Sequence, residues 1–183
     1  MRGFTLIELL IVVAIIGILA ALLIPNAMTA IQKAKQKSSM KDIVTIATGS
    51  ADYITDHGSF QGITQAGDLA AQNTFILAIS PFYVKIVPVN DAWGTPYQVY
   101  AGEAAVEGAL SNVAAADIGE DDFVIGSFGR DKATGPTYSM VTYDPANPEA
   151  AIYNVSSMAD FQEDMVNWDG SWIVGPRTAR AVS

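Results

Sequence analysis

The segment from residue 3 to residue 26 reads GFTLIELLIVVAIIGILAALLIPN, and the architecture of the chain follows from it. From Phe4 to Ile24 there are 21 residues, and a helix of that length, at about 1.5 Å per residue, nearly matches the roughly 30 Å of a bilayer core. One acid, Glu8, stands in this apolar run. An ionised carboxylate in hydrocarbon is costly and is usually kept because it meets a positive partner. The segment therefore predicts a membrane-spanning helix whose Glu8 needs a partner from outside it.

A cleaved secretory signal peptide and an uncleaved signal anchor are the alternatives for this segment. A secretory signal has a basic region, a shorter apolar stretch and a small-residue cleavage site. Here only Met1-Arg2-Gly3 precedes the apolar run, and Ala20-Ala21 is followed by large residues and Pro25. An uncleaved anchor agrees with the composition, but it gives no reason for Glu8.

Residues 3–8, GFTLIE, with the apolar run behind them, resemble the class III signal of type IV pilins and of the pseudopilins of type II secretion. The resemblance implies that a prepilin peptidase cuts between Gly3 and Phe4 and that the new amino group of Phe4 is methylated. It also implies that Glu8 faces the N-terminal amine of a neighbouring subunit in a filament. Opposite charges attract strongly in a low dielectric, so we expect Glu8 to be a determinant of filament assembly.

The expected organisation is a leader peptide at residues 1–3, a transmembrane and filament-core helix at residues 4–26, and a globular domain at residues 27–183. The net charge is −9, and from Ala51 onward there are 17 acids against 5 bases. Such a surface repels a nucleic-acid backbone, so we expect no nucleic-acid binding. The chain has no cysteine, so disulfide bonds cannot hold its loops.

The helical pattern resumes after Pro25 and ends near His57-Gly58. We expect a kink at Gly17 or Pro25, since glycine weakens a helix and proline removes a hydrogen bond. Beyond Pro25 an amphipathic stripe at helical spacing is expected to face the core. The stripe consists of Met40, Ile43, Val44, Ala47, Ala51 and Ile54.

The remaining sequence predicts an α+β fold, in which the long N-terminal helix packs on a small antiparallel sheet. Short helices are expected within 67–79 and at 160–168, and a loop or a short helix is expected within 101–117. Strands are expected where aromatic and β-branched residues gather between turn formers, at residues 83–89, 97–101, 123–128, 137–143 and 172–174.

Two further segments resemble the major pseudopilin of type II secretion. Residues 90–97, NDAWGTPY, predict a turn at Gly94 and Pro96 with Trp93 and Tyr97 as apolar anchors. Residues 125–131, IGSFGRD, resemble a calcium-binding loop of that family.

That second resemblance implies a calcium site with Ser127, Asp131 and Asp144 as candidate ligands. Further ligands are expected from residues 160–169. Calcium accepts carboxylates and carbonyls in a shell of roughly 6 to 8 oxygens. A solvated acidic turn without metal is the alternative.

A single histidine, no cysteine and no nucleophile or phosphate-loop motif argue against an enzyme. The lysines after the span, taken with the positive-inside rule, point the domain toward the cytoplasm; the family resemblance places it outside, and we follow the resemblance. We therefore expect a single-pass precursor in the inner membrane that becomes a periplasmic or cell-surface filament.

Its expected partners are copies of itself, prepilin peptidase, an inner-membrane assembly platform, and minor pilins or pseudopilins. The first functional hypothesis is a major pseudopilin of type II secretion. A type IV pilus subunit for motility or adhesion is the second, and a membrane-anchored binding module or enzyme that never polymerises is the third.

Overall fold

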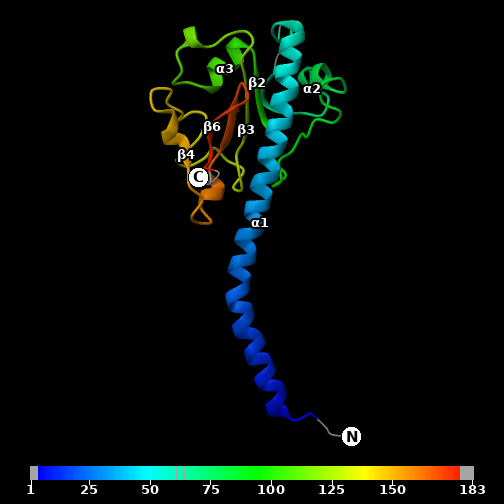
Figure 1. Ribbon diagram of the computed structural model, residues 1–183, viewed down its shortest axis with the longest axis vertical. Coiled ribbons are helices and arrows are strands. Elements are labelled where there is room, and N and C mark those ends of the chain that lie inside the picture. Colours follow the sequence, from blue (N-terminus) through cyan, green and yellow to red (C-terminus); the bar gives the residue numbers. More distant parts are fainter. Residues whose placement is uncertain (1–3, 61, 64, 178–183) are drawn as a thin grey trace, which may run out of the picture. The chain divides into compact units, whose positions relative to one another are not determined.

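A computed structural model describes residues 4–60, 62–63 and 65–177 of the chain (Figure 1). They form two compact units, one ending at Ala34 and the other beginning at Lys35. The helices are α1 (Leu6–His57), α2 (Thr74–Ile79) and α3 (Glu103–Ala109), with short 3₁₀ turns at Ala115–Asp117, Pro148–Ala151 and Asp160–Gln162. The strands are β1 (Gln65–Asp68), β2 (Gln98–Ala101), β3 (Phe123–Ser127), β4 (Ile152–Tyr153), β5 (Met165–Trp168) and β6 (Ser171–Pro176). The α+β class predicted from the sequence is confirmed.

The six strands form one sheet in the order β1-β2-β3-β5-β6-β4. Every neighbouring pair is antiparallel except β4 with β6, which is parallel. The chain reverses direction between β4 and β5 and again between β5 and β6, so β4 and β6 run the same way. The sheet is therefore mixed, and the expectation of a purely antiparallel sheet was wrong at this edge.

Both faces of the sheet are buried. Along β3, Phe123 and Ile125 point into a core cluster shared with α1 and α2, while Val124 points into a second cluster shared with α3. In Figure 1 α1 and α2 lie on one side of the strands and α3 on the other. This alternation follows from the two-residue period of a strand. It explains why all five residues of β3 are buried.

The buried face of α1 within the second unit differs from the predicted stripe. Its buried residues are Gln36, Ser39, Ile43, Ile46, Ala47, Gly49 and Ser50. Val44 and Ala51, expected in the core, are exposed. The other four residues of the stripe face the core as predicted: Ile43 and Ala47 are buried, and Met40 and Ile54 pack against the same cluster. Polar side chains that were not predicted share this face; the Ser39 hydroxyl oxygen, for example, accepts a hydrogen bond from the Ala92 N–H at 3.0 Å. Buried polar groups with partners cost little.

A glycine allows close packing on this face. A Cβ at Gly49 would lie 2.2 Å from Cγ2 of Val84. The segment carrying Val84 was predicted as a strand over 83–89, but it forms turns: the N–H groups of Tyr83 and Val84 both donate to the carbonyl of Ile79, at 3.0 and 2.9 Å. Local turn bonds and packing against α1 thus prevail over β propensity.

Two other predictions were wrong for related reasons. Residues 137–143 form no strand, because the N–H groups of Thr137 and Tyr138 donate to the carboxylate of Glu163. Residues 160–168 are not one helix; a 3₁₀ turn leads into β5, which pairs with β3. Within 67–79, α2 covers only the second half. The end of α1, strands β2, β3 and β6, and a helix within 101–117 agree with prediction.

Candidate functional site

The first turn of α1 contains a capping box. Thr5 precedes the first helical residue, and its N–H and hydroxyl both donate to Oε2 of Glu8, at 2.8 and 2.6 Å. The Glu8 N–H donates back to the Thr5 hydroxyl oxygen at 3.3 Å. In such a box the two side chains satisfy each other's free backbone N–H groups. Glu8 therefore holds the start of its own helix.

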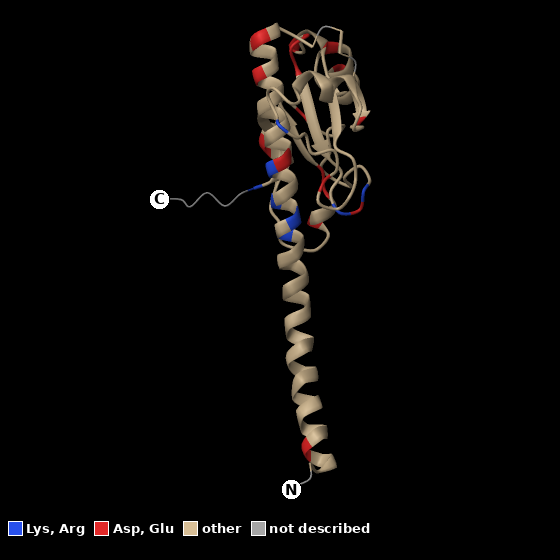
Figure 2. Cartoon of the chain, turned by 90° about the vertical axis from the view of Figure 1, so that its right-hand side faces the viewer, with Lys and Arg blue, Asp and Glu red and all other residues tan. Residues whose placement is uncertain are grey.

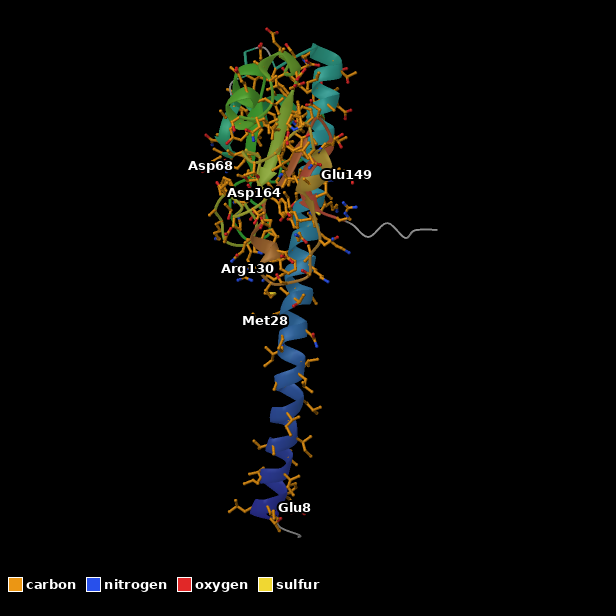
Figure 3. All side chains as sticks on the ribbon, turned by 90° about the vertical axis from the view of Figure 1, so that its left-hand side faces the viewer. Glu8, Met28, Asp68, Arg130, Glu149 and Asp164 are labelled. Carbon is orange, nitrogen blue, oxygen red and sulfur yellow. The ribbon has the colours of Figure 1, made fainter. Side chains whose placement is uncertain are left out.

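Glu8 was predicted to matter for assembly, but Thr5 was not predicted as its partner. The signal was present, since Thr5-Leu6-Ile7-Glu8 matches the S/T-x-x-E pattern of a capping box ahead of an apolar run. Both bonds from Thr5 reach the same oxygen, Oε2, and in the described part of the chain no group donates to Oε1. Oε1 is thus available to a donor from another molecule. Figure 3 labels Glu8 near the N-terminal end of α1.

The helix that follows is long and apolar enough to cross a membrane, and its most apolar stretch is not buried by any of the described residues. Figure 2 shows this stretch of α1 beyond Glu8 as a helix without charged residues. Large side chains from Leu6 (83% exposed) to Ile24 (57% exposed) are uncovered, so lipid or other protein must cover them.

Of the other predicted residues of this segment, the structure describes Phe4, Gly17 and Pro25. Gly3 lies outside the described residues, and Phe4 directly precedes the cap and is exposed. Gly17 and Pro25 both lie inside α1, which is continuous through them. Next to Pro25 the hydroxyl of Thr29 donates to the Pro25 carbonyl at 3.1 Å, and such bonds from Ser or Thr to the carbonyl four residues back often accompany helix bends. The kink stays a prediction.

The turn at residues 90–97 is formed as predicted. Gly94 has a φ of +83°, and the Asp91 N–H donates to the Thr95 carbonyl at 2.8 Å. Tyr97 is completely buried, and its hydroxyl donates to the Asp42 carboxylate of α1 at 3.2 Å. Trp93 packs partly buried against the same core. This turn fixes the sheet to the helix.

Asp91 is the centre of that turn and its role was not predicted. One carboxylate oxygen accepts the N–H groups of Trp93 and Thr95, both at 2.9 Å. The other accepts the hydroxyl of Ser127 at 2.7 Å. The two segments that carry the family resemblance, 90–97 and 125–131, are therefore joined by one buried carboxylate.

Each of the three predicted calcium ligands has a hydrogen-bond partner within the chain. The Ser127 hydroxyl is engaged with Asp91. Asp131 is exposed and accepts the Ala133 N–H at 3.3 Å, and Asp144 is exposed and accepts the Ala146 N–H at 2.9 Å. Within the described residues, no group of three or more Asp, Glu or His side chains has metal-binding spacing.

A different carboxylate faces the 125–135 loop. Asp164 is 1% exposed; one of its oxygens accepts the Gly135 N–H at 2.8 Å, and the other, Oδ2, is buried without a hydrogen-bond partner. Burial raises the pKa of Asp164 to about 8, and the charges of Asp131 and Glu163 act in the same direction, against the lowering effect of the Gly135 N–H. Figure 3 labels Asp164 within the globular unit. An unpaired buried oxygen next to other carboxylates is a place where a cation would be stabilising.

Comparisons with known proteins agree with these features. The model of the prokaryotic N-terminal methylation motif matches residues 1–24. The type II secretion system core protein G of Aeromonas hydrophila is 37% identical over 103 residues, covering 53% of this chain and 71% of that protein. The corresponding protein of Pseudomonas aeruginosa is 39% identical over 105 residues, with 54% and 72% covered. That of Escherichia coli is 30% identical over 127 residues, with 66% and 87% covered. No solved structure matches.

Proposed function

Because the chain belongs to the family of the type II secretion system core protein G, we propose that it assembles into a helical periplasmic filament that promotes protein export. In this role it is a structural subunit with no reaction of its own. The observation that carries the proposal is the first half of α1, an apolar helix that none of the described residues covers, with one carboxylate at its start. A membrane can cover such a helix in the precursor, and neighbouring copies can cover it in a filament.

The chemistry of assembly follows from the cap. Cleavage between Gly3 and Phe4 would create an ammonium group one residue before Thr5. Glu8 keeps its own helix capped through Oε2, while Oε1 accepts the ammonium group of a neighbouring copy. An ion pair shielded from water is strong when both charges are paired and costly when one is removed. A neighbouring copy at another axial position would leave Glu8 unpaired and is therefore disfavoured. This one ion pair thus fixes the axial position of each copy relative to the next.

The partners follow from the same role. We propose prepilin peptidase as the processing enzyme, an inner-membrane platform as the assembly site, and minor pseudopilins as companions in the filament. The motif at residues 1–24 supports processing and methylation of Phe4. Mass spectrometry of the mature chain tests this step, since a methylated Phe4 is expected at its start and an intact Met1 would contradict it.

The experiment that tests Glu8 separates its charge from its cap. Glu8→Gln removes the charge, but its amide oxygen can still accept from Thr5, as glutamine does in capping boxes. Thr5→Ala removes the two hydrogen bonds of the Thr5 hydroxyl and keeps the charge. We expect membrane insertion of both variants, loss of sheared filaments in electron micrographs for Glu8→Gln, and retained filaments for Thr5→Ala. Normal filaments from Glu8→Gln would refute the ion pair.

We also propose that the loop over residues 125–135 binds calcium, with Asp131 and Asp164 as its carboxylate ligands. The support is the partnerless Oδ2 of Asp164 and the raised pKa of this carboxyl, which is caused first by burial and then by the charge of Asp131. Backbone carbonyls and water would complete a shell of roughly 6 to 8 oxygens. The ion would neutralise buried negative charge and hold the loop, a role that disulfide bonds cannot take in a chain without cysteine.

A further inference from the structure

Within the globular unit α1 carries two pairs of like charges. Lys37 and Lys41 are four residues apart, and so are Asp52 and Asp56. Like charges at this spacing are neighbours on a helix and destabilise it. Asp56 also lies in the last turn of α1, where the helix dipole disfavours a negative charge. Local features that oppose the fold are expected where a surface serves a function.

Among the described residues these four charges have no ion partner. In the described part of the chain the single ion pair joins Arg177 to Glu149, at 3.9 Å. Lys37, Lys41 and Asp52 are exposed, and Asp56 is exposed with one carboxylate oxygen accepting the Tyr83 hydroxyl at 2.8 Å. Figure 2 shows the basic residues on the part of α1 nearer its N-terminal half and acidic residues toward its C-terminal end. The four charges are thus open to another molecule.

The spacing of the two pairs is self-complementary. Lys37 precedes Asp52 by 15 residues, and Lys41 precedes Asp56 by the same 15. Lys41 and Asp52 are 11 residues apart, close to three turns at about 3.6 residues per turn, so both pairs share one face of the helix. Fifteen residues of helix rise about 22 Å. One axial offset of that size brings both lysines of one helix level with both aspartates of a parallel helix.

We propose that this face of α1 is a contact between staggered copies of the chain, in which Lys37 pairs with Asp52 and Lys41 with Asp56 of the next copy. The inference rests on the proposed filament. Anionic lipid would attract the lysines, but it would repel the two aspartates on the same face, whereas a second copy satisfies both pairs. From residue 51 onward acids outnumber bases by 17 to 5, so copies that lack the lysine contact repel one another.

Apolar surface accompanies the charges, which matters because exposed ion pairs alone hold an interface weakly. Val44 lies between the two pairs on α1 and is 45% exposed. At the aspartate end, Tyr83 bonds to Asp56, and the ring of Phe82, 82% exposed, lies 4.8 Å from the ring of Tyr83. A contact in which apolar groups exclude water around charged pairs has the usual anatomy of a specific interface.

Zero-length crosslinking of the processed full chain tests the pairing directly. A carbodiimide joins an amine and a carboxylate that are in contact, and peptide mapping identifies the joined residues. We expect links from Lys37 to Asp52 and from Lys41 to Asp56 in filaments. Within one helix these partners are about 22 Å apart, so any such link joins two copies. Raising the salt concentration should lower the yield of links. Filaments without these links would overturn the proposal.

Charge reversal is a second test of the pairing. Lys37→Glu and Asp52→Lys should each reduce the yield of filaments about fivefold, the factor expected from the upper range of an exposed ion pair, and the double variant should restore it. Lys85→Glu, an equal change outside α1, is the matched control and should leave the yield unchanged.

Three outcomes separate the alternatives. Normal yields from both single variants would overturn the pairing and leave the filament standing. No filaments from the unsubstituted chain would overturn both proposals. If Lys37→Glu lowers only binding to phosphatidylglycerol vesicles and leaves filaments unchanged, the lysines serve the lipid surface and the pairing is wrong.

Discussion

Gly49 gives the sharpest prediction about the globular unit. Replacing it with alanine adds a methyl group that would lie 2.2 Å from Cγ2 of Val84. Carbon atoms in ordinary contact are separated by about 3.5 to 4.0 Å, so one of the two elements must move by more than about 1 Å. Val84 is buried and β-branched, and such a side chain has little freedom to rotate away.

The size of the effect is a balance of two terms. Alanine is favoured over glycine in a helix interior by about 1 kcal/mol, and overpacking a tight core costs about 1 to 3 kcal/mol. We therefore expect Gly49→Ala to lower the free energy of unfolding by about 1 kcal/mol, and the melting temperature by about 2 to 4 °C for a unit of this size.

Thermal unfolding of the full chain in detergent, followed by circular dichroism, is the assay. Gly108→Ala is the matched control, because Gly108 is helical in α3 and a Cβ there meets nothing within 4 Å; it should raise the melting temperature. The double variant Gly49→Ala/Val84→Ala should lose less stability than the sum of the two single variants, because the smaller side chain at position 84 leaves room for the added methyl group. If Gly49→Ala stabilises as much as Gly108→Ala, the close packing of the 83–84 segment on α1 is refuted.

Three further predictions concern the buried carboxylates. Asp91→Ala should lower the free energy of unfolding by about 3 kcal/mol or more, because it removes the acceptor of three hydrogen bonds, one of them from the buried Ser127 hydroxyl. Asp91→Asn keeps an acceptor and should cost less than half as much; equal losses in urea titrations would contradict this role. Without divalent ions, stability should fall as pH rises from about 4 to about 8, by at most about 1.4 kcal/mol per pH unit from Asp164, because folded Asp164, with its pKa raised by burial to about 8, holds a proton that the unfolded chain releases. Asp169, whose pKa burial raises to about 7, adds to the fall below that pH. Asp164→Asn should therefore reduce the slope and abolish the part between about pH 7 and 8, and a slope unchanged in that variant would exclude Asp164 as a source. At pH 8, a chelator should lower the melting temperature and calcium should restore it in the unsubstituted chain but not in Asp131→Asn; an identical transition with and without chelator would eliminate the metal.

The sequence predicts best where one physical requirement dominates. An uninterrupted apolar run admits few structures other than a spanning helix, and β3 is recognisable because its residues are apolar on both faces. The turn at Gly94 and Pro96 was predictable because each residue restricts the backbone in a known way.

The misses come from contacts between residues far apart in sequence. Asp164 looks like a surface acid, and only the fold shows that it is buried beneath the loop that contains Gly135. The segment at 83–89 has the composition of a strand, but the close approach allowed by Gly49 holds it against α1. The role of Asp91 depends on Ser127, 36 residues away. In contrast, the Thr5–Glu8 cap was local and could have been read from the sequence.

The outermost strands of the sheet limit how copies of this chain can associate. An edge strand with unpaired N–H and C=O groups can pair with a strand of another chain, and this risk of aggregation is greater when copies are close together. Here one edge is β4, of two residues, and the other is β1, of four residues, in which Gly67 has a φ of +101°. Such short and irregular edges are poor templates for intermolecular β-structure. Even at high local concentration, copies of the chain are therefore expected to associate through helix contacts, which are reversible. Irreversible cross-β aggregation is disfavoured.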